Sequence, residues 1–228
     1  MKIIAGNFKS NKTRNETISY LNKLDSTLKP HDSTKIYIFP SISSIVSNDF
    51  THITLGTQNA HFATSGAFTG EITLTHLEEF RIKTILLGHS ERRNLFNESD
   101  EIVAKKFDFF MKENFEIFFC IGENLAVREA NKTKDFLKNQ LSKINLNYNH
   151  LILAYEPIWA IGTGENASLE QIKEVYDFLK TLCKKPIIYG GSVNENNAKE
   201  ILEITDGVLV GNASLEVEKF HQIIRSSI

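Results

Sequence analysis

The segment 151–154 reads LILA, an unbroken apolar run that is followed directly by YEP at 155–157. The run shows no alternation between apolar and polar residues, which a strand with one solvated face would show. Strands that are buried on both faces have this pattern, and they are typical of a parallel sheet that helices cover. The segment therefore predicts a buried parallel strand with polar residues at its carboxyl end.

Seven more short apolar runs occur along the chain, and successive runs start about 29 positions apart on average. These runs occupy residues 3–5, 36–39, 53–55, 84–87, 117–121, 186–189 and 208–210. The intervals between them have helical patterns over about 13–28, 99–110 and 168–179, the last two of which open on a capping serine and an acidic first turn. The intervals that follow residues 39 and 189 are short, and we expect a helix of two or three turns in each.

A strand followed by a helix, repeated eight times within about 250 residues, closes into a (β/α)8 barrel. The alternative is an open doubly wound sheet, which needs a glycine-rich fingerprint after the first strand, and AGNFK at 5–9 is not one. No linker or composition change divides the chain. We therefore expect a single barrel domain over residues 1–228.

The composition excludes several classes of protein. The chain has 228 residues, 41% of them hydrophobic, and its 26 basic and 28 acidic side chains give a formal net charge of −2. We expect no nucleic-acid or membrane partner, so an anionic ligand needs a local positive site. Cys120 and Cys183 belong to no metal-spaced cluster, and no apolar run approaches 18 residues. These features predict a cytoplasmic protein with no metal site.

Polar residues follow several of the runs, where barrel enzymes build their active sites. They are Asn7, Lys9, His89, Glu156, Ser192, Gly211 and Asn212. Taken singly, each has a structural explanation: a solvated lysine, a hydrogen-bonded histidine, a buried ion pair or a tight glycine turn. Independent structural roles would rarely gather them at one end of one barrel, so the set predicts a site.

The chemistry of this set favours proton transfer. A carboxylate at Glu156, beside apolar neighbours, would be desolvated and would gain basicity. His89 at the start of a short helix would stay neutral and could donate to a developing oxyanion. Main-chain N–H groups after the last two strands could hold a phosphate. Together they fit proton abstraction next to a carbonyl in a small phosphorylated molecule.

The motifs around these residues resemble those of the triosephosphate isomerase family over nearly the whole chain. They are GNFK at 6–9, GAFTGE at 66–71, GHSERR at 88–93, CIGE at 120–123, YEPIWAIGTG at 155–164 and YGGSV at 189–193. The resemblance implies a TIM barrel without a cofactor. It also implies the glycolytic and gluconeogenic interconversion of dihydroxyacetone phosphate and D-glyceraldehyde 3-phosphate through an enediolate.

The resemblance also implies roles for individual residues. Glu156 would be the base and His89 the neutral electrophile, while Lys9 would carry the positive charge and Asn7 a further hydrogen bond. Glu91 would pair with Lys9. The main-chain N–H groups that would bind the phosphate belong to Gly162, Ser192, Gly211 and Asn212.

Two loops have functions in the family. The segment 157–167 resembles a closing lid, although Glu165 stands where a basic residue is common. The loop 59–73 would insert into a second subunit, with Thr69 near the partner's Lys9, and this predicts a homodimer. Asn212 stands where the family usually has a glycine, and asparagine tolerates a positive φ better than most residues.

Two alternatives remain at this point. A different isomerase on the same fold, acting on a phosphoribosyl sugar, would share the phosphate turns but would have no reason to combine Lys9, His89 and Glu156. A non-catalytic barrel descendant could bind a phosphate ligand or act as an interaction protein. Loss of one of these three residues would be its simplest sign, and all three are present.

Overall fold

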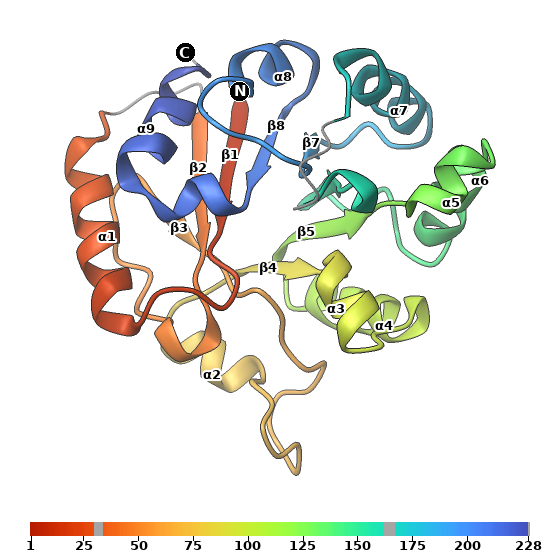
Figure 1. Cartoon of the computed structure of the whole chain (residues 1–228). Coiled ribbons are helices and arrows are strands. Elements are labelled where there is room, and N and C mark those ends of the chain that lie inside the picture. Colours follow the sequence, from red (N-terminus) through yellow and green to blue (C-terminus); the bar gives the residue numbers. More distant parts are fainter. Residues whose placement is uncertain (30–33, 162–166, 228) are drawn as a thin grey trace.

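The computed structural model describes residues 1–29, 34–161 and 167–227. Within these ranges, eight parallel strands form one sheet in the order β3-β2-β1-β8-β7-β6-β5-β4 (Figure 1). The strands are β1 Lys2–Asn7, β2 Thr34–Phe39, β3 Thr54–Leu55, β4 Thr84–Leu87, β5 Glu116–Ile121, β6 Leu151–Tyr155, β7 Ile187–Tyr189 and β8 Gly207–Val210. Each of the eight predicted runs coincides with one of these strands.

The sheet closes between its two ends, β3 and β4. Thr57, just beyond β3, forms a parallel bridge with Ile85 of β4. The Thr57 N–H donates to the Thr84 carbonyl at 3.0 Å, and the Leu86 N–H donates to the Thr57 carbonyl at 2.9 Å. Closure removes the free edges of the sheet. The predicted (β/α)8 barrel is therefore confirmed.

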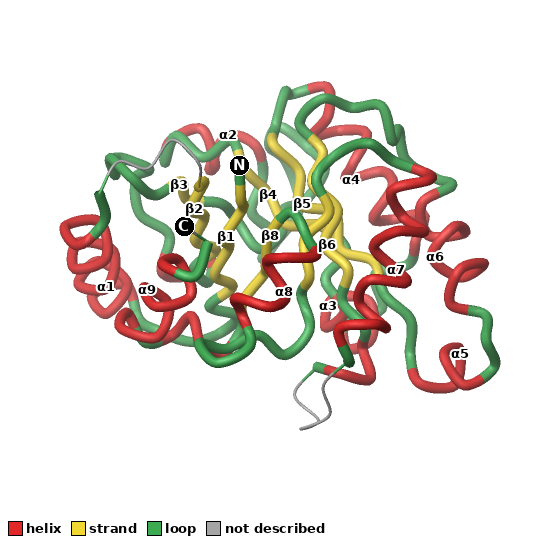
Figure 2. Tube along the Cα trace, turned by 90° about the horizontal axis from the view of Figure 1, so that it is seen from above, coloured by secondary structure: helices red, strands yellow, loops and turns green. Residues whose placement is uncertain are grey.

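Helices surround the strands when the molecule is viewed from above (Figure 2). Those of the described part are α1 Arg14–Thr27, α2 Leu74–Glu79, α3 Ser90–Leu95, α4 Asp100–Lys112, α5 Leu125–Glu129, α6 Thr133–Leu141, α7 Leu169–Leu182, α8 Ala198–Ile204 and α9 Val217–Arg225. The three helices expected from their patterns are α1, α4 and α7. Their N-cap side chains, Thr13, Ser99 and Ser168, each accept a hydrogen bond from the N–H three residues later.

The helix expected between β2 and β3 is absent, and that prediction was wrong. The described chain has only a 3-10 turn there, Ile42–Ser44. Pro40 and four serines make this segment a poor helix, since serine hydroxyls compete for hydrogen bonds. The Ser44 hydroxyl donates to the Lys12 carbonyl at 2.7 Å, which fixes the segment against another loop. The second short interval contains α8, as expected.

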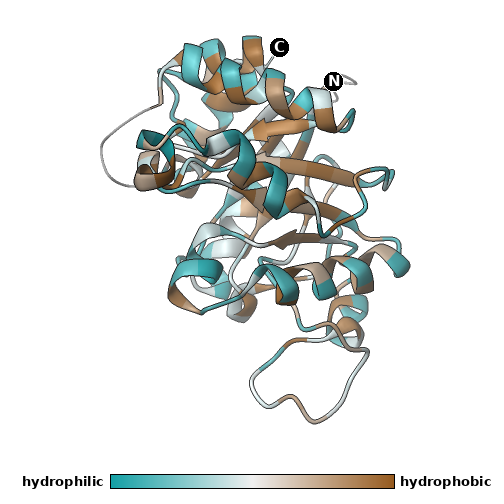
Figure 3. Ribbon diagram, turned by 90° about the vertical axis from the view of Figure 1, so that its right-hand side faces the viewer, coloured by the Kyte–Doolittle hydropathy of each residue, from teal (hydrophilic) through white to brown (hydrophobic). Residues whose placement is uncertain are grey.

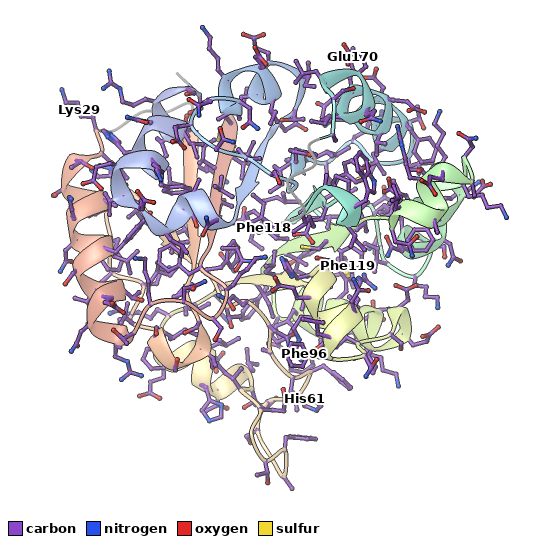
Figure 4. All side chains as sticks on the ribbon, viewed as in Figure 1. Lys29, His61, Phe96, Phe118, Phe119 and Glu170 are labelled. Carbon is purple, nitrogen blue, oxygen red and sulfur yellow. The ribbon has the colours of Figure 1, made fainter. Side chains whose placement is uncertain are left out.

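The hydrophobic core has two layers, because neighbouring strand residues point to opposite faces. On β5, Phe118 lies inside the barrel, whereas Phe119 packs between the sheet and the helices (Figure 4). Inside the barrel the Phe118 ring contacts those of Tyr37 and Phe39, with centroids 4.9 and 5.1 Å apart. Apolar residues accordingly concentrate on the strands (Figure 3). The filled interior leaves the ends of the barrel for ligands.

Candidate active site

A cavity of about 480 Å³ lies at the carboxyl end of the strands and holds most of the predicted residues. Its lining includes Asn7, Lys9, His89, Glu156, Ser192, Gly211 and Asn212. Glu91 contacts the lining through Lys9. Gly162 lies outside the described residues, as does the rest of 162–166 within the segment 157–167 that was predicted to be a lid.

Glu156 follows β6 and is almost completely buried, with 2% of its surface exposed. One carboxylate oxygen lies 3.4 Å from Nε2 of His89, and the other accepts a hydrogen bond from the Ser90 N–H at 3.2 Å. Two glycines make room for this residue: a Cβ on Gly190 would lie 2.8 Å from its Cγ, and one on Gly122 would lie 1.8 Å from its carbonyl oxygen. Close approach therefore requires glycine at both positions.

His89 caps the N-terminus of α3 and is 6% exposed. Its Nδ1 accepts a hydrogen bond from the Glu91 N–H at 3.2 Å. A ring nitrogen that accepts carries no proton, so the imidazole is neutral in this arrangement and its proton resides on Nε2. The donor Nε2–H thus faces Glu156 and the cavity.

Lys9 has a positive φ of 50°, which is uncommon for a residue with a side chain. Two side chains hold this conformation: Asn7 accepts from the Lys9 N–H at 2.9 Å, and Gln58 donates to the Lys9 carbonyl at 2.8 Å. The ammonium group of Lys9 donates to Glu91 at 2.6 Å. Strained backbone of this kind costs about 1–3 kcal/mol and is often found at functional sites.

The turns after β7 and β8 form the other end of the cavity. In the described residues, the main-chain N–H groups of Gly211 and Asn212 make no hydrogen bond to another main-chain group. Asn212 begins the 3-10 turn Asn212–Leu215 and does not have a positive φ. The N–H and the hydroxyl of Ser192 both donate to the Ala160 carbonyl, at 3.2 and 2.8 Å.

Several residues at the site were missed by sequence reasoning. Cys120 lies against Glu156; complete burial raises the pKa of its thiol, and the negative charge of Glu156 raises it further. Buried Glu123 accepts hydrogen bonds from the Tyr155 hydroxyl and the Trp159 indole, both at 3.1 Å. Cys120 and Glu123 fall in the motif CIGE, so their position at the carboxyl end of β5 and just after it was the signal in the sequence. Lys219 of α9 also lines the cavity, and no pattern in the sequence around it pointed to the site.

The cavity at the carboxyl end is not the largest in the molecule. A cavity of about 970 Å³ lies at the amino end of β2, β3 and β5, and its described lining includes none of the predicted site residues. Among the described residues, no group of three or more histidine, cysteine or acidic side chains could hold a metal ion. In the same ranges, no helix has both the length and the apolar character that a membrane crossing requires.

Comparison with known proteins agrees with this arrangement. The family model for triosephosphate isomerase matches residues 2–227. The chain is 50% identical to the triosephosphate isomerase of Helicobacter hepaticus over the whole of both chains. It is 52% identical to that of Helicobacter pylori strain Shi470 over 98% of each chain, and 48% identical to that of Sulfurovum sp. over 97% of this chain and 99% of the other. The chain therefore belongs to the triosephosphate isomerase family.

Proposed function

We propose that this enzyme interconverts dihydroxyacetone phosphate and D-glyceraldehyde 3-phosphate, a step of glycolysis and gluconeogenesis, with Glu156 as the base and His89 as the electrophile. The observation that carries the proposal is the 3.4 Å contact between the Glu156 carboxylate and Nε2 of neutral His89. Both groups are buried at the wall of the cavity of about 480 Å³, which has room for a small phosphorylated molecule. Family membership supports the isomerase reaction, and these contacts support the residues.

The proposed mechanism moves one proton between two carbon atoms. Glu156 removes a proton from C1 of dihydroxyacetone phosphate, the C–H electron pair forms the C1=C2 bond, and the carbonyl electrons move to O2. The Nε2–H of His89 donates to that oxygen as its charge develops. The protonated Glu156 then returns the proton to C2. The proton of the O1 hydroxyl passes to O2 through Nε2 of His89, so that C1 becomes the aldehyde and C2 carries the hydroxyl. Because the hydrogens are redistributed within one molecule, the reaction needs no cofactor.

The contacts of Glu156 set a condition on this mechanism. In the structure the carboxylate accepts from the Ser90 N–H at 3.2 Å, which is near the long limit for such a bond. A substrate carbon must replace that contact before the proton can move. Because this hydrogen bond is long, the exchange costs little free energy.

The remaining charges fit a phosphorylated substrate. Lys9 would stabilise the enediolate, Glu91 would position Lys9, and Asn7 would add a hydrogen bond from the end of β1. The N–H groups of Gly211, Asn212 and Ser192 would bind the phosphate, and Ser192 would first have to release the Ala160 carbonyl. The contribution of Gly162 and the role of segment 157–167 as a lid stay predictions that derive from the resemblance.

The test is a coupled assay with glyceraldehyde 3-phosphate on the wild type and on Glu156→Asp. Shortening the side chain withdraws the carboxylate by about 1 Å, and we expect kcat to fall by about 10²-fold with little change in KM. An inactive wild type would favour the alternative of a non-catalytic barrel that binds a phosphate ligand. A fully active Glu156→Asp would contradict the role of Glu156.

The proposal extends to the assembly of the protein. The loop 59–73 protrudes from the barrel (Figures 1 and 3). Phe68 within it is 38% exposed, and on α3 and just after it Leu95 and Phe96 are 69% and 61% exposed. Phe96 is drawn on the side from which the loop protrudes (Figure 4). Exposed apolar surface of this kind marks an interface, so we propose a homodimer through this loop.

Sedimentation velocity tests the dimer. The wild type should sediment as a dimer at micromolar concentration, and Phe96→Glu should shift it towards the monomer because a charge would enter the apolar interface. Leu125→Glu is the matched control, because Leu125 is also exposed and lies on α5, which is drawn away from the protruding loop (Figure 1). A fully active wild-type monomer would contradict the assembly.

The proposal also covers location and domain structure. We assign residues 1–228 to a single domain, because one closed sheet takes strands from Lys2 to Val210. We place the enzyme in the cytoplasm, since Cys120 and Cys183 are both free and buried.

A further inference from the structure

Lys219 lies at the phosphate end of the cavity. It belongs to the first turn of α9, and it lines the cavity together with Ser192, Asn194 and Asn212. Its ammonium group is bound to Glu216 at 2.7 Å. The hydrogen bond and charge of Glu216 raise the pKa of Lys219, and the charge of Glu195 raises it further. Lys219 is therefore a fixed positive charge at neutral pH.

The two acidic neighbours of Lys219 come from different loops. Glu195 follows β7 and Glu216 follows β8, and both also line the cavity. These are the loops whose N–H groups would bind the phosphate. Lys219 thus lies between two loops that would both contact the same anion. Its hydrogen bond to Glu216 and the negative charge of Glu195 hold its ammonium group there.

The charges that line the cavity are unfavourable for an anion unless a cation lies at its phosphate end. The charged residues in the described lining are Lys9, Lys219, Glu156, Glu195 and Glu216. Lys9 donates to Glu91 and lies at the end of β1, on the side of the reacting groups. A phosphate dianion would therefore enter a cavity whose carboxylates outnumber its ammonium groups, and main-chain N–H groups supply only partial charges.

We propose that Lys219 is a specificity-determining residue for the phosphate of the substrate, and that Glu216 competes with the substrate for its ammonium group. The ligand class is a phosphate monoester dianion. This inference rests on the proposed function and deepens it, because it assigns a side-chain cation to the phosphate end. On substrate binding, the Lys219 charge would be shared between Glu216 and the phosphate.

The proposal predicts opposite effects for two partners of one ion pair. Lys219→Gln should raise the KM for glyceraldehyde 3-phosphate, and the inhibition constant of inorganic phosphate, by about 3- to 10-fold at low salt. Glu216→Gln should lower both values by about 2-fold, since it frees the lysine. Half-molar salt should reduce both effects, because exposed charges are screened.

Two further measurements separate this role from a structural one. The kcat for glyceraldehyde 3-phosphate and the slow turnover of unphosphorylated glyceraldehyde should stay within about 2-fold of the wild type in Lys219→Gln. Lys23→Gln is the matched control, because Lys23 forms the same kind of exposed ion pair with Glu218 of α9 and does not line this cavity. It should leave KM and the phosphate inhibition constant unchanged.

The outcomes are distinct. If Lys219→Gln matches Lys23→Gln in KM and in phosphate inhibition, the inference is wrong while the isomerase function stands. If turnover of glyceraldehyde falls as much as that of its phosphate, Lys219 supports the fold and does not recognise phosphate. A wild type that does not isomerise glyceraldehyde 3-phosphate overturns the proposed function itself.

Discussion

The two ends of the barrel hold cavities of different character. The cavity at the amino end has about 970 Å³, and its described lining combines buried apolar residues such as Ile36 and Ile53 with basic side chains that are exposed or half-buried, such as Lys29, His52 and Arg225, and with the carboxylate of Glu116. The cavity at the carboxyl end has about 480 Å³, but it contains Glu156 and His89, which are buried and in contact. Size therefore does not identify the site. The burial of polar groups is the better guide to the site. Removing a carboxylate and an imidazole from water costs free energy, and such groups are often found where they have a function.

The largest expected difference concerns the histidines of the two ends. His89→Gln should lower kcat by about 10²–10³-fold, because the variant loses the imidazole donor to the developing oxyanion. His52→Gln, at the amino end, should leave kcat and KM unchanged. The coupled assay measures both variants, and circular dichroism checks that both are folded. Equal losses of kcat in the two variants would contradict the assignment of the active site to the carboxyl end.

The second prediction compares an ion cluster at each end. At the carboxyl end, buried Glu98 accepts hydrogen bonds from Lys106 at 2.7 Å and from Arg92 at 2.6 Å, and Lys106 also donates to Asn59 at the base of the protruding loop. At the amino end, Glu116 lies 3.7 Å from the exposed ammonium of Lys35. Glu98→Gln should lower the free energy of unfolding by about 3 kcal/mol, because it leaves a lysine charge buried without its partner. Glu116→Gln should cost less than about 1 kcal/mol.

This prediction has a pH dependence. Burial raises the pKa of Glu98, but the hydrogen bonds and charges of Lys106 and Arg92 outweigh it and hold the pKa below its usual value. A carboxyl group with a lowered pKa stabilises the fold above its unfolded pKa, about 4.3, and the gain is lost as the pH falls through the folded value. Urea unfolding should be measured between pH 7 and pH 3. The difference in the free energy of unfolding between the wild type and Glu98→Gln should shrink below about pH 4.3. A constant gap would mean that the charge of Glu98 is not involved.

The smallest effect is expected for Tyr37→Phe. The Tyr37 ring lies inside the barrel, where burial, and after it the charge and hydrogen bond of Glu116, raise the pKa of its hydroxyl. Removing the hydroxyl should lower the free energy of unfolding by about 1 kcal/mol without a change in kcat. Urea unfolding and the coupled assay measure the two quantities. A lower kcat would show that the two ends are energetically coupled.

Most of the barrel could be predicted from the sequence because each strand is a short run buried on both faces, such as residues 151–154. The same logic placed Glu156 and His89, since a residue that directly follows a strand must lie at the carboxyl end. The prediction of a helix within 40–53 was wrong because it rested on spacing alone. Pro40 disfavours a helix, and the serines of this segment favour hydrogen bonds to nearby loops.

The parts that were missed depend on long-range packing. Lys219 reaches the cavity only because α9 lies against the turn after β8. Lys106 is buried although its helical pattern would allow it to be solvated, because Glu98 and Asn59 meet it from two other segments. Neither contact has a signature in the local sequence, since both depend on how distant segments meet in the fold.

The rings of Tyr37, Phe39 and Phe118 fill the middle of the barrel and separate its two mouths. Because these rings fill the interior between the two cavities, we expect changes at the amino end to leave the chemistry at the carboxyl end intact. A fused domain or an immobilisation tether attached at the amino end should therefore leave kcat in the coupled assay unchanged.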